Sequence, residues 1–166
     1  MRPVADETEL VRRAQLGSVA AFEQLVVDVG PSVHRYLGLR LRHDGEARDA
    51  LQETLTAAWQ GLPSLQQPGK FRSWLLGIAT HKAADARRNR LRTSKPELEL
   101  QGREDESLLG IREAILALPA SFRDVLLLRY VLQLSEDEVA AALGVRLGTV
   151  KSRSARARKA LEGLLG

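Results

Sequence analysis

The stretch SEDEVAAALGVRLGTVKSRSARARKAL, residues 135–161, carries the clearest structural pattern in the chain. Ser135 with Glu138 three residues later forms a capping box, which predicts a short helix from there to about Leu143. Gly144 follows at the position where helices favour glycine. Thr149 is predicted to cap a final helix that runs to about Leu165. Two helices joined by a glycine-containing turn predict a helix-turn-helix.

The charges on these two predicted helices differ. The first helix begins with three acidic residues, which suit the positive end of its dipole. The second carries five cations against the single anion Glu162, namely Lys151, Arg153, Arg156, Arg158 and Lys159. A basic helix fits the major groove of DNA, where its N-terminal residues reach base edges. We assign to the groove side Thr149, Lys151, Ser152, Ala155 and Arg156, and to the DNA backbone or the helix surface Arg153 and Arg158. A solvated basic helix is the weaker alternative, because turn, caps and charge coincide.

Upstream of this motif, the apolar residues recur at helical spacing throughout the chain. Ser121 is the predicted cap of a helix through Tyr130. In the first half, Asp6 with Glu9 resembles a capping box, and Ser18 is the predicted cap of the next helix. Gly30-Pro31 predicts a break or kink. No stretch alternates like a strand, so the prediction is an all-α protein.

The composition of the 166 residues limits the possible classes. A hydrophobic fraction of 44% is enough for packed cores, and only 4% aromatic residues favour helices over sheets. The absence of cysteine excludes a disulfide scaffold, a thiol nucleophile and thiolate metal sites. No apolar run approaches the roughly 18 residues of a membrane-spanning helix. The N-terminal MRPVADETEL lacks the apolar core of a signal peptide, so we expect a soluble cytoplasmic protein.

The net charge of +4 is unevenly distributed. Residues 1–92 hold 14 Lys/Arg against 10 Asp/Glu, and residues 111–166 hold 9 against 6. Residues 93–110 between them hold 2 against 5. This pattern predicts two helical domains, at 6–92 and 109–166, joined by an acidic flexible linker at 93–108. Each basic block could meet a polyanion.

A second candidate binding site runs from Trp74 to Arg92. Aromatic residues beside a basic run suit single-stranded or melting DNA, because unstacked bases rest on rings while cations hold the backbone. The polar candidates in this stretch are His81, Lys82, Asp85, Arg87 and Arg88. Ordinary core packing is the more common role for aromatic residues at helical spacing, such as Phe71 and Trp74.

A third candidate is a polar stripe on the predicted helix that ends near Leu62. Asp49, Gln52, Glu53 and Thr56 share one face because they are spaced three and four residues apart. By the pattern alone, this stripe is a solvated surface.

Catalytic patterns are weak, so we do not expect an enzyme. The three histidines, His34, His43 and His81, lie in no metal-ligand spacing. There is no phosphate-binding glycine loop and no nucleophile elbow. We therefore expect no metal, no cofactor and no small-molecule substrate.

Four segments, in order and spacing, resemble the extracytoplasmic-function (ECF) group of bacterial RNA polymerase sigma factors. They are ALQETLTAAWQGL (50–62), FRSWLLGIATHKAADARRNR (71–90), LPASFRDVLLLRYVLQLSEDEVAAALGV (118–145) and GTVKSRSARARKAL (148–161). The resemblance covers nearly the whole chain, from about Glu9 to Leu161. It implies two helical domains, regions two and four, joined by a linker.

The resemblance also implies roles for the three candidate sites. The helix at 46–62 would dock on the largest subunit of core RNA polymerase through Asp49, Gln52, Glu53 and Trp59. The segment at 74–92 would recognise and open the minus-ten element, with Trp74, His81, Lys82, Asp85, Arg87 and Arg88 as contacts. The helix at 149–161 would read the minus-thirty-five element while its domain contacts the second-largest subunit. Ser154-Ala155 replaces a bulkier pair usual in the family.

The function implied is promoter-specific initiation of transcription, with core polymerase, promoter DNA and an anti-sigma factor as partners. The competing interpretation is a stand-alone helix-turn-helix regulator that binds duplex DNA. A weaker one is a structural protein with a basic surface. The N-terminal half separates the first two, because a plain repressor has no need of LQETLTAAW (51–59) or of the segment at 71–90.

Overall fold

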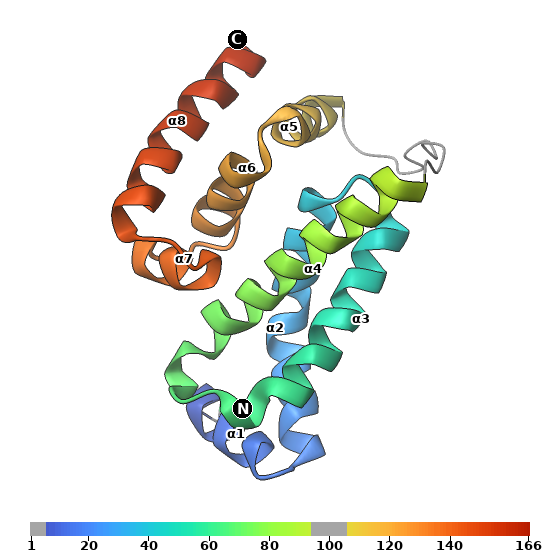
Figure 1. The fold of residues 1–166 in the computed structure, drawn as a ribbon, viewed down its shortest axis with the longest axis vertical. Helices are drawn as coiled ribbons and strands as arrows, with labels where there is room; N and C mark the ends of the chain where they lie inside the picture. The colour runs from blue at the N-terminus through green and yellow to red at the C-terminus, as the bar shows by residue number, and fades with distance from the viewer. Residues whose placement is uncertain (1–5, 94–105) are drawn as a thin grey trace.

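The computed structural model describes residues 6–93 and 106–166, with side chains from residue 109 onward in the second segment. Every regular element in these two segments is helical, which confirms the all-α prediction (Figure 1). The α-helices are α1 (Glu7–Gln15), α2 (Val19–Arg40), α3 (Asp44–Gly61), α4 (Phe71–Thr93), α5 (Glu106–Ala117), α6 (Ala120–Leu126), α7 (Glu136–Leu143) and α8 (Leu147–Leu165). Two 3₁₀ turns, η1 (Leu62–Ser64) and η2 (Pro68–Lys70), connect α3 to α4, and a π-helical turn, η3 (Leu127–Val131), continues α6. No helix in the described part of the chain is long and apolar enough to cross a membrane.

The first half, residues 6–93, is built from α1 to α4. Ser18 caps α2 as predicted, because its side chain accepts a hydrogen bond from the backbone of Ala21 at 3.2 Å. Asp6 caps α1 by accepting from the backbone of Thr8 at 3.2 Å, without the predicted return contact from Glu9. The largest fully buried side chains of this half come from α2 and α4, and they include Tyr36, Leu25 and Phe71.

Of the predicted break or kink at Gly30-Pro31, the break is wrong, because α2 runs through both residues to Arg40. Proline removes one helical hydrogen bond and strains the preceding turn. The residues of α2 on either side of Pro31 nevertheless pack in the core, since Val29 and Val33 are both buried. Helices in proteins take most of their stability from such packing, which here outweighs the local penalty.

The second half, residues 106–166, holds the predicted helix-turn-helix. The capping box at the start of α7 is confirmed: Ser135 accepts from the backbone of Glu138 at 3.1 Å, and the Glu138 carboxylate accepts from the backbone of Ser135 at 2.7 Å. Gly144 ends α7 in the left-handed conformation, with φ of 64°. Glycine adopts this backbone without steric penalty.

Two predicted N-caps in this half are wrong. The caps are Pro119 for α6 and Arg146 for α8, so both helices begin earlier than expected. The backbone of Thr149 already donates to the carbonyl of Arg146 at 2.9 Å, which places Thr149 inside the first turn of α8. Ser121 lies in the first turn of α6 in the same way, because Phe122 donates to the carbonyl of Pro119 at 3.0 Å.

The two halves are in direct contact, although the sequence predicted two bodies joined by a linker. Figure 1 shows α7 beside the middle of α4, and the buried apolar cluster includes residues of both halves. A Cβ atom on Gly77 of α4 would lie only 2.8 Å from the carbonyl oxygen of Ala142 of α7. Thr93 and Glu106 lie in helices, so the predicted linker at 93–108 overlaps helix at both ends. Residues 94–105 of it lie outside the described residues.

Candidate nucleic-acid interface

The outer face of α8 carries most of the residues assigned to the DNA groove. Lys151, Ser152, Ala155 and Arg156 are exposed, while Thr149 and Arg153 are half-buried at the edges of this face. The inner face packs on the rest of the second half through Val150, Ser154 and Ala157. α8 is therefore anchored by one face and presents the other, basic, face to solvent.

Local contacts hold parts of this face in place. The Lys151 ammonium lies 4.0 Å from the Glu136 carboxylate at the start of α7, which ties the two helices of the motif together. The Ser152 hydroxyl donates to the carbonyl of Thr149 at 3.1 Å. Ser154 is only 5% exposed, so of the substituted pair Ser154-Ala155 only Ala155 lies on the outer face.

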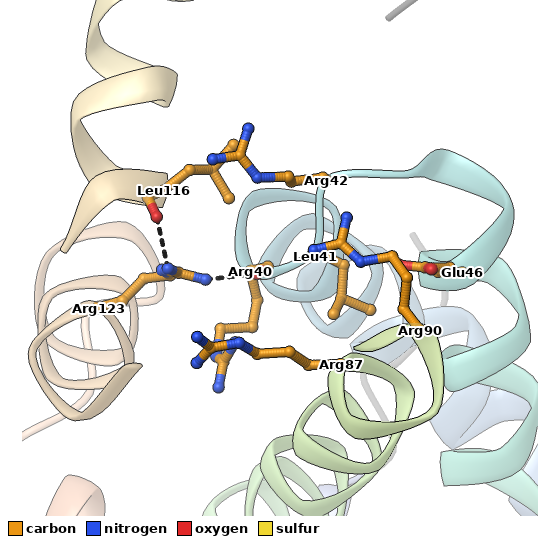
Figure 2. A pocket seen from close by; sticks show the side chains of 8 residues that line it. All are labelled: Arg40, Leu41, Arg42, Glu46, Arg87, Arg90, Leu116 and Arg123. Carbon is orange, nitrogen blue, oxygen red and sulfur yellow. Dashed lines mark hydrogen bonds between the residues drawn. The ribbon is translucent and has the colours of Figure 1, made fainter. Parts of the chain in front are cut away.

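Most of the minus-ten candidates lie on one face of α4. Trp74, His81, Asp85 and Arg88 are spaced seven, four and three residues apart, which places them along one side of the helix. His81 and Arg88 are exposed, and Asp85 forms an ion pair with Arg88. Arg87 is also exposed, but it lies on another side of α4, where it lines a cavity between the two halves (Figure 2).

The two aromatic residues of this segment have different surroundings. Phe71 is 1% exposed and belongs to the core, as the packing alternative predicted. Trp74 is half-buried, with its ring centroid 6.1 Å from that of Phe71. Its other neighbour is Gly61, where a Cβ would lie 3.3 Å from the indole, so glycine provides room for the ring.

The polar stripe predicted on α3 is exposed along its length. Asp49, Gln52, Glu53 and Thr56 all face solvent. Trp59 continues the stripe and is 37% exposed, with its ring centroid 5.0 Å from that of Phe22. Glu53 also lies 4.0 Å from the ammonium of Lys82, so this stripe adjoins the candidate face of α4.

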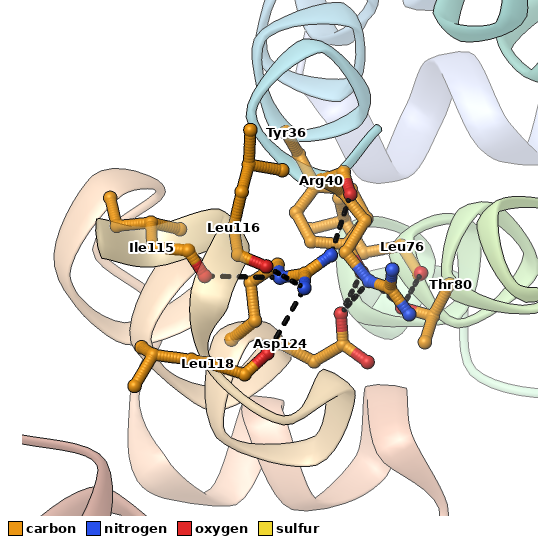
Figure 3. Close-up of polar contacts among 9 residues, drawn as sticks. Tyr36, Arg40, Leu76, Thr80, Ile115, Leu116, Leu118 and Asp124 are labelled. Carbon is orange, nitrogen blue, oxygen red and sulfur yellow. Dashed lines mark hydrogen bonds and ion pairs between the residues drawn. The ribbon is translucent and has the colours of Figure 1, made fainter. Parts of the chain in front are cut away.

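Sequence reasoning missed a buried polar cluster formed by Tyr36, Arg40, Arg123 and Asp124, with Tyr36 and Arg40 from α2 and the other two from α6 (Figure 3). The carboxylate of Asp124 accepts from the phenol of Tyr36 at 2.8 Å and from Nε of Arg40 at 2.5 Å. The Tyr36 oxygen also lies 3.2 Å from the hydroxyl of Thr80 on α4. This polar cluster therefore joins the two halves through buried, charged hydrogen bonds.

Arg123 holds the end of α5 and the end of α2. Its guanidinium donates to the carbonyl oxygens of Ile115, Leu116 and Leu118 at 3.2, 2.6 and 3.0 Å, and to that of Arg40 at 3.0 Å. It thus satisfies carbonyl groups that helix ends leave without partners. Burial, and then the nearby charge of Arg40, lower the pKa of Arg123 to about 10. Burial raises the pKa of the Tyr36 phenol, which stays protonated. One feature of the sequence could have indicated this polar cluster. The charged residues Arg123 and Asp124 lie between the apolar residues Phe122 and Val125 of a predicted helix.

Two family models match the chain, one in each half. Sigma-70 region 2 matches residues 25–93, which include the candidate faces of α3 and α4. Sigma-70 region 4 matches residues 108–161, which include the helix-turn-helix.

Relatives of known family match almost the whole chain. The ECF RNA polymerase sigma factor SigC of Mycobacterium tuberculosis is 34% identical over 93% of this chain and 88% of its own length. The ECF RNA polymerase sigma factor ShbA of Streptomyces griseus is 33% identical over 93% of each.

Solved structures of sigma factors share the fold. CnrH, solved in complex with the cytosolic domain of CnrY, matches with a TM-score of 0.79 and 28% identity over 96% of both chains. RpoE of Bartonella quintana, solved with the anti-sigma factor NepR, matches with a TM-score of 0.75 and 26% identity over 89% of this chain and 98% of its own. Because the sequence matches span both regions and both candidate DNA-binding segments, the chain belongs to the ECF RNA polymerase sigma factors, which direct the initiation of transcription.

Proposed function

We propose that α8 of this sigma factor reads the minus-thirty-five element in the major groove. The observation that carries the proposal is the exposed basic face of α8, which follows a capped helix and a left-handed glycine turn. Lys151 and Ser152 lie near the N-terminal end of α8, where recognition helices reach base edges. Arg156, Arg158 and Lys159 are exposed further along and supply cations for the phosphate backbone.

The exposed face of α4 is the proposed site for the minus-ten element. His81 and Arg88 offer polar and cationic groups on the face that Trp74 shares, and Lys82 and Asp85 lie half-buried beside them. A flipped base costs a few kcal/mol of unstacking, which such a surface together with the polymerase must offset. Arg87 is exposed as well, on the side of α4 that lines the cavity between the halves.

The exposed stripe of α3, from Asp49 to Trp59, is the proposed contact with the largest subunit of core polymerase. The second half would contact the second-largest subunit. An anti-sigma factor is a further proposed partner, supported by the two solved relatives that were captured with CnrY and NepR. In this account the chain is a non-enzymatic specificity subunit that acts in the cytoplasm.

The contact between the halves has to open for both promoter elements to be bound. Elements centred about 25 base pairs apart are separated by roughly 85 Å of B-DNA. A compact chain of this length has a radius of gyration of only about 15 Å. We therefore infer that the α4–α7 contact belongs to the free protein, and that polymerase and DNA hold the halves apart.

A polymerase-binding experiment tests the role of α3. Asp49→Ala with Glu53→Ala should weaken binding to core polymerase by roughly tenfold or more, because two charge-assisted contacts are lost. The matched control is Glu23→Ala with Asp28→Ala, which removes the same charge from exposed positions on α2. Equal affinity of the two double variants, measured by fluorescence anisotropy with labelled protein, would contradict the assignment.

A further inference from the structure

A cavity of about 120 Å³ lies where the two halves meet (Figure 2). The first half provides the end of α2, the start of α3 and the last turns of α4, and the second half provides α5 and α6. The lining residues are Arg40, Leu41, Arg42, Glu46, Arg87, Arg90, Leu116 and Arg123. Five of the eight are arginines and one is an acid, so the cavity wall carries a large excess of positive charge.

The partners of these arginines only partly balance that charge. Arg40 pairs with Asp124, and Arg42 lies 3.6 Å from the carboxylate of Glu113 at a solvent-exposed position. Arg90 is 3.0 Å from Nε2 of His43. Arg87 has no ion pair among the described residues.

Arg40, which contributes to the wall, also holds a buried donor without a partner among the described residues. Arg40 is 2% exposed, and its Nη1 has no hydrogen-bond partner in the part of the chain that the structure describes. A buried donor without an acceptor is costly, and native proteins rarely leave one in that state. The five arginines of the wall, with only Glu46 among the lining residues to offset their charge, indicate that an anion completes the site.

We propose that this cavity binds a small phosphate-bearing anion. Guanidinium groups match phosphate oxygens through paired, charge-assisted hydrogen bonds, and arginine is the side chain that suits such recognition best. One water needs roughly 10–15 Å³ of such a volume, so the cavity is large enough for a compact anion such as pyrophosphate. A DNA duplex is far too wide to enter a cavity of about 120 Å³. The unfavourable charge of Arg40, Arg87 and Arg42 on Arg123, which contributes to its lowered pKa, would be relieved by the bound anion.

Because both halves line the cavity, the anion would stabilise their contact. A ligand that binds only the closed arrangement shifts the population towards it in proportion to its differential affinity. Bound phosphate would thus oppose the separation of the halves and compete with polymerase binding.

Titration of pyrophosphate and of orthophosphate into the full-length chain, at constant ionic strength, tests the proposal. We expect saturable binding by calorimetry and a higher thermal unfolding midpoint, with sodium chloride as the reference. Arg42→Gln and Arg90→Gln should each weaken binding by about tenfold, because each removes a charge-assisted contact. Arg92→Gln, an exposed arginine two residues further along α4 that does not line the cavity, is the matched control and should bind like the unmodified chain.

Three outcomes would overturn the proposal: no saturable binding, equal weakening by Arg92→Gln, or full binding by both cavity variants. A different result would show that these arginines bind nucleic acid instead. In that case the unmodified chain would not bind pyrophosphate, and Arg42→Gln and Arg90→Gln would weaken its binding to a short DNA. The radius of gyration of the full-length chain should fall with pyrophosphate, and an unchanged value at saturation would show that the anion does not favour closure.

Discussion

Lys151 and Arg156 project from the exposed face of α8, where Arg156 lies further along the helix. If both contact bases, Lys151→Ala and Arg156→Ala should each cost about 1–3 kcal/mol of discrimination between promoters. That corresponds to roughly 5- to 150-fold in relative use of a preferred over a mismatched minus-thirty-five element. Competitive transcription from paired templates with reconstituted polymerase measures this ratio.

Lys159→Ala provides the comparison for these two variants. Lys159 is exposed near the C-terminal end of α8, so its loss should weaken all promoters alike through the phosphate backbone. Unchanged promoter choice in both Lys151→Ala and Arg156→Ala would remove these residues from base recognition.

Asp124 is the one carboxylate in the buried polar cluster, where it accepts from both Tyr36 and Arg40. Asp124→Ala leaves the Arg40 charge buried without its counter-ion, which should lower the free energy of unfolding by about 3–5 kcal/mol. Urea unfolding followed by circular dichroism measures the loss. A decrease below about 1 kcal/mol would show that the pair adds little to the closed structure.

The double substitution Arg40→Met with Asp124→Leu separates the two causes of that loss. Replacement of a buried ion pair by apolar side chains of similar size is often neutral, because both desolvation penalties disappear together. The double variant should therefore be more stable than Asp124→Ala alone.

The exposure of the candidate site residues was easier to predict from the sequence than the position of the buried polar ones. The outer face of α8 and the stripe of α3 follow from helical spacing, which also determines which side packs. The polar cluster does not, because Arg40 and Asp124 are 84 positions apart and their pairing depends on how the halves meet. Nothing local in the sequence encodes that contact.

At the scale of the elements, α4 and α7 approach each other most closely at Gly77. Gly77→Ala would place a Cβ within 2.8 Å of the Ala142 carbonyl oxygen, a distance that side chains do not tolerate. The substitution should therefore separate α7 from α4 while it raises the helix propensity of α4 by about 1 kcal/mol. Small-angle scattering should record a larger radius of gyration with unchanged helical content.

Gly163→Ala is the matched control, because it makes the same change within a helix where no other atom lies within 4 Å of the new Cβ. Its radius of gyration should equal that of the unmodified chain. If the Gly77→Ala variant had the same radius of gyration as the unmodified chain, the contact between the two halves would not require the close approach of α4 and α7 at Gly77.

Element boundaries show where local signals are sufficient. The capping box at Ser135 and the left-handed Gly144 were predicted correctly, because side-chain and backbone chemistry alone determine them. A chain break at Pro31 does not occur, since core packing of α2 overrides the local preference of proline. Thr149 was misplaced as a cap, because α8 begins earlier, after the extended backbone of Arg146.

At the scale of the whole molecule, the two halves of the described structure are in contact, and the proposed function requires this contact to open. Buried contacts of Asp124 with Tyr36 and Arg40 join the halves, and α7 lies against α4, the helix proposed to bind the minus-ten element. Sequence patterns predicted two units but not this association.

The central claim is that this chain directs core polymerase to paired promoter elements, and one measurement tests it most directly. Purified protein and bacterial core polymerase are combined on a pool of templates with randomised upstream sequence, and the transcribed molecules are sequenced. The account predicts two enriched elements at a fixed spacing, with the upstream one altered by Lys151→Ala. Specific duplex binding by the protein alone, without transcription by the active polymerase, would contradict it and favour a stand-alone helix-turn-helix regulator.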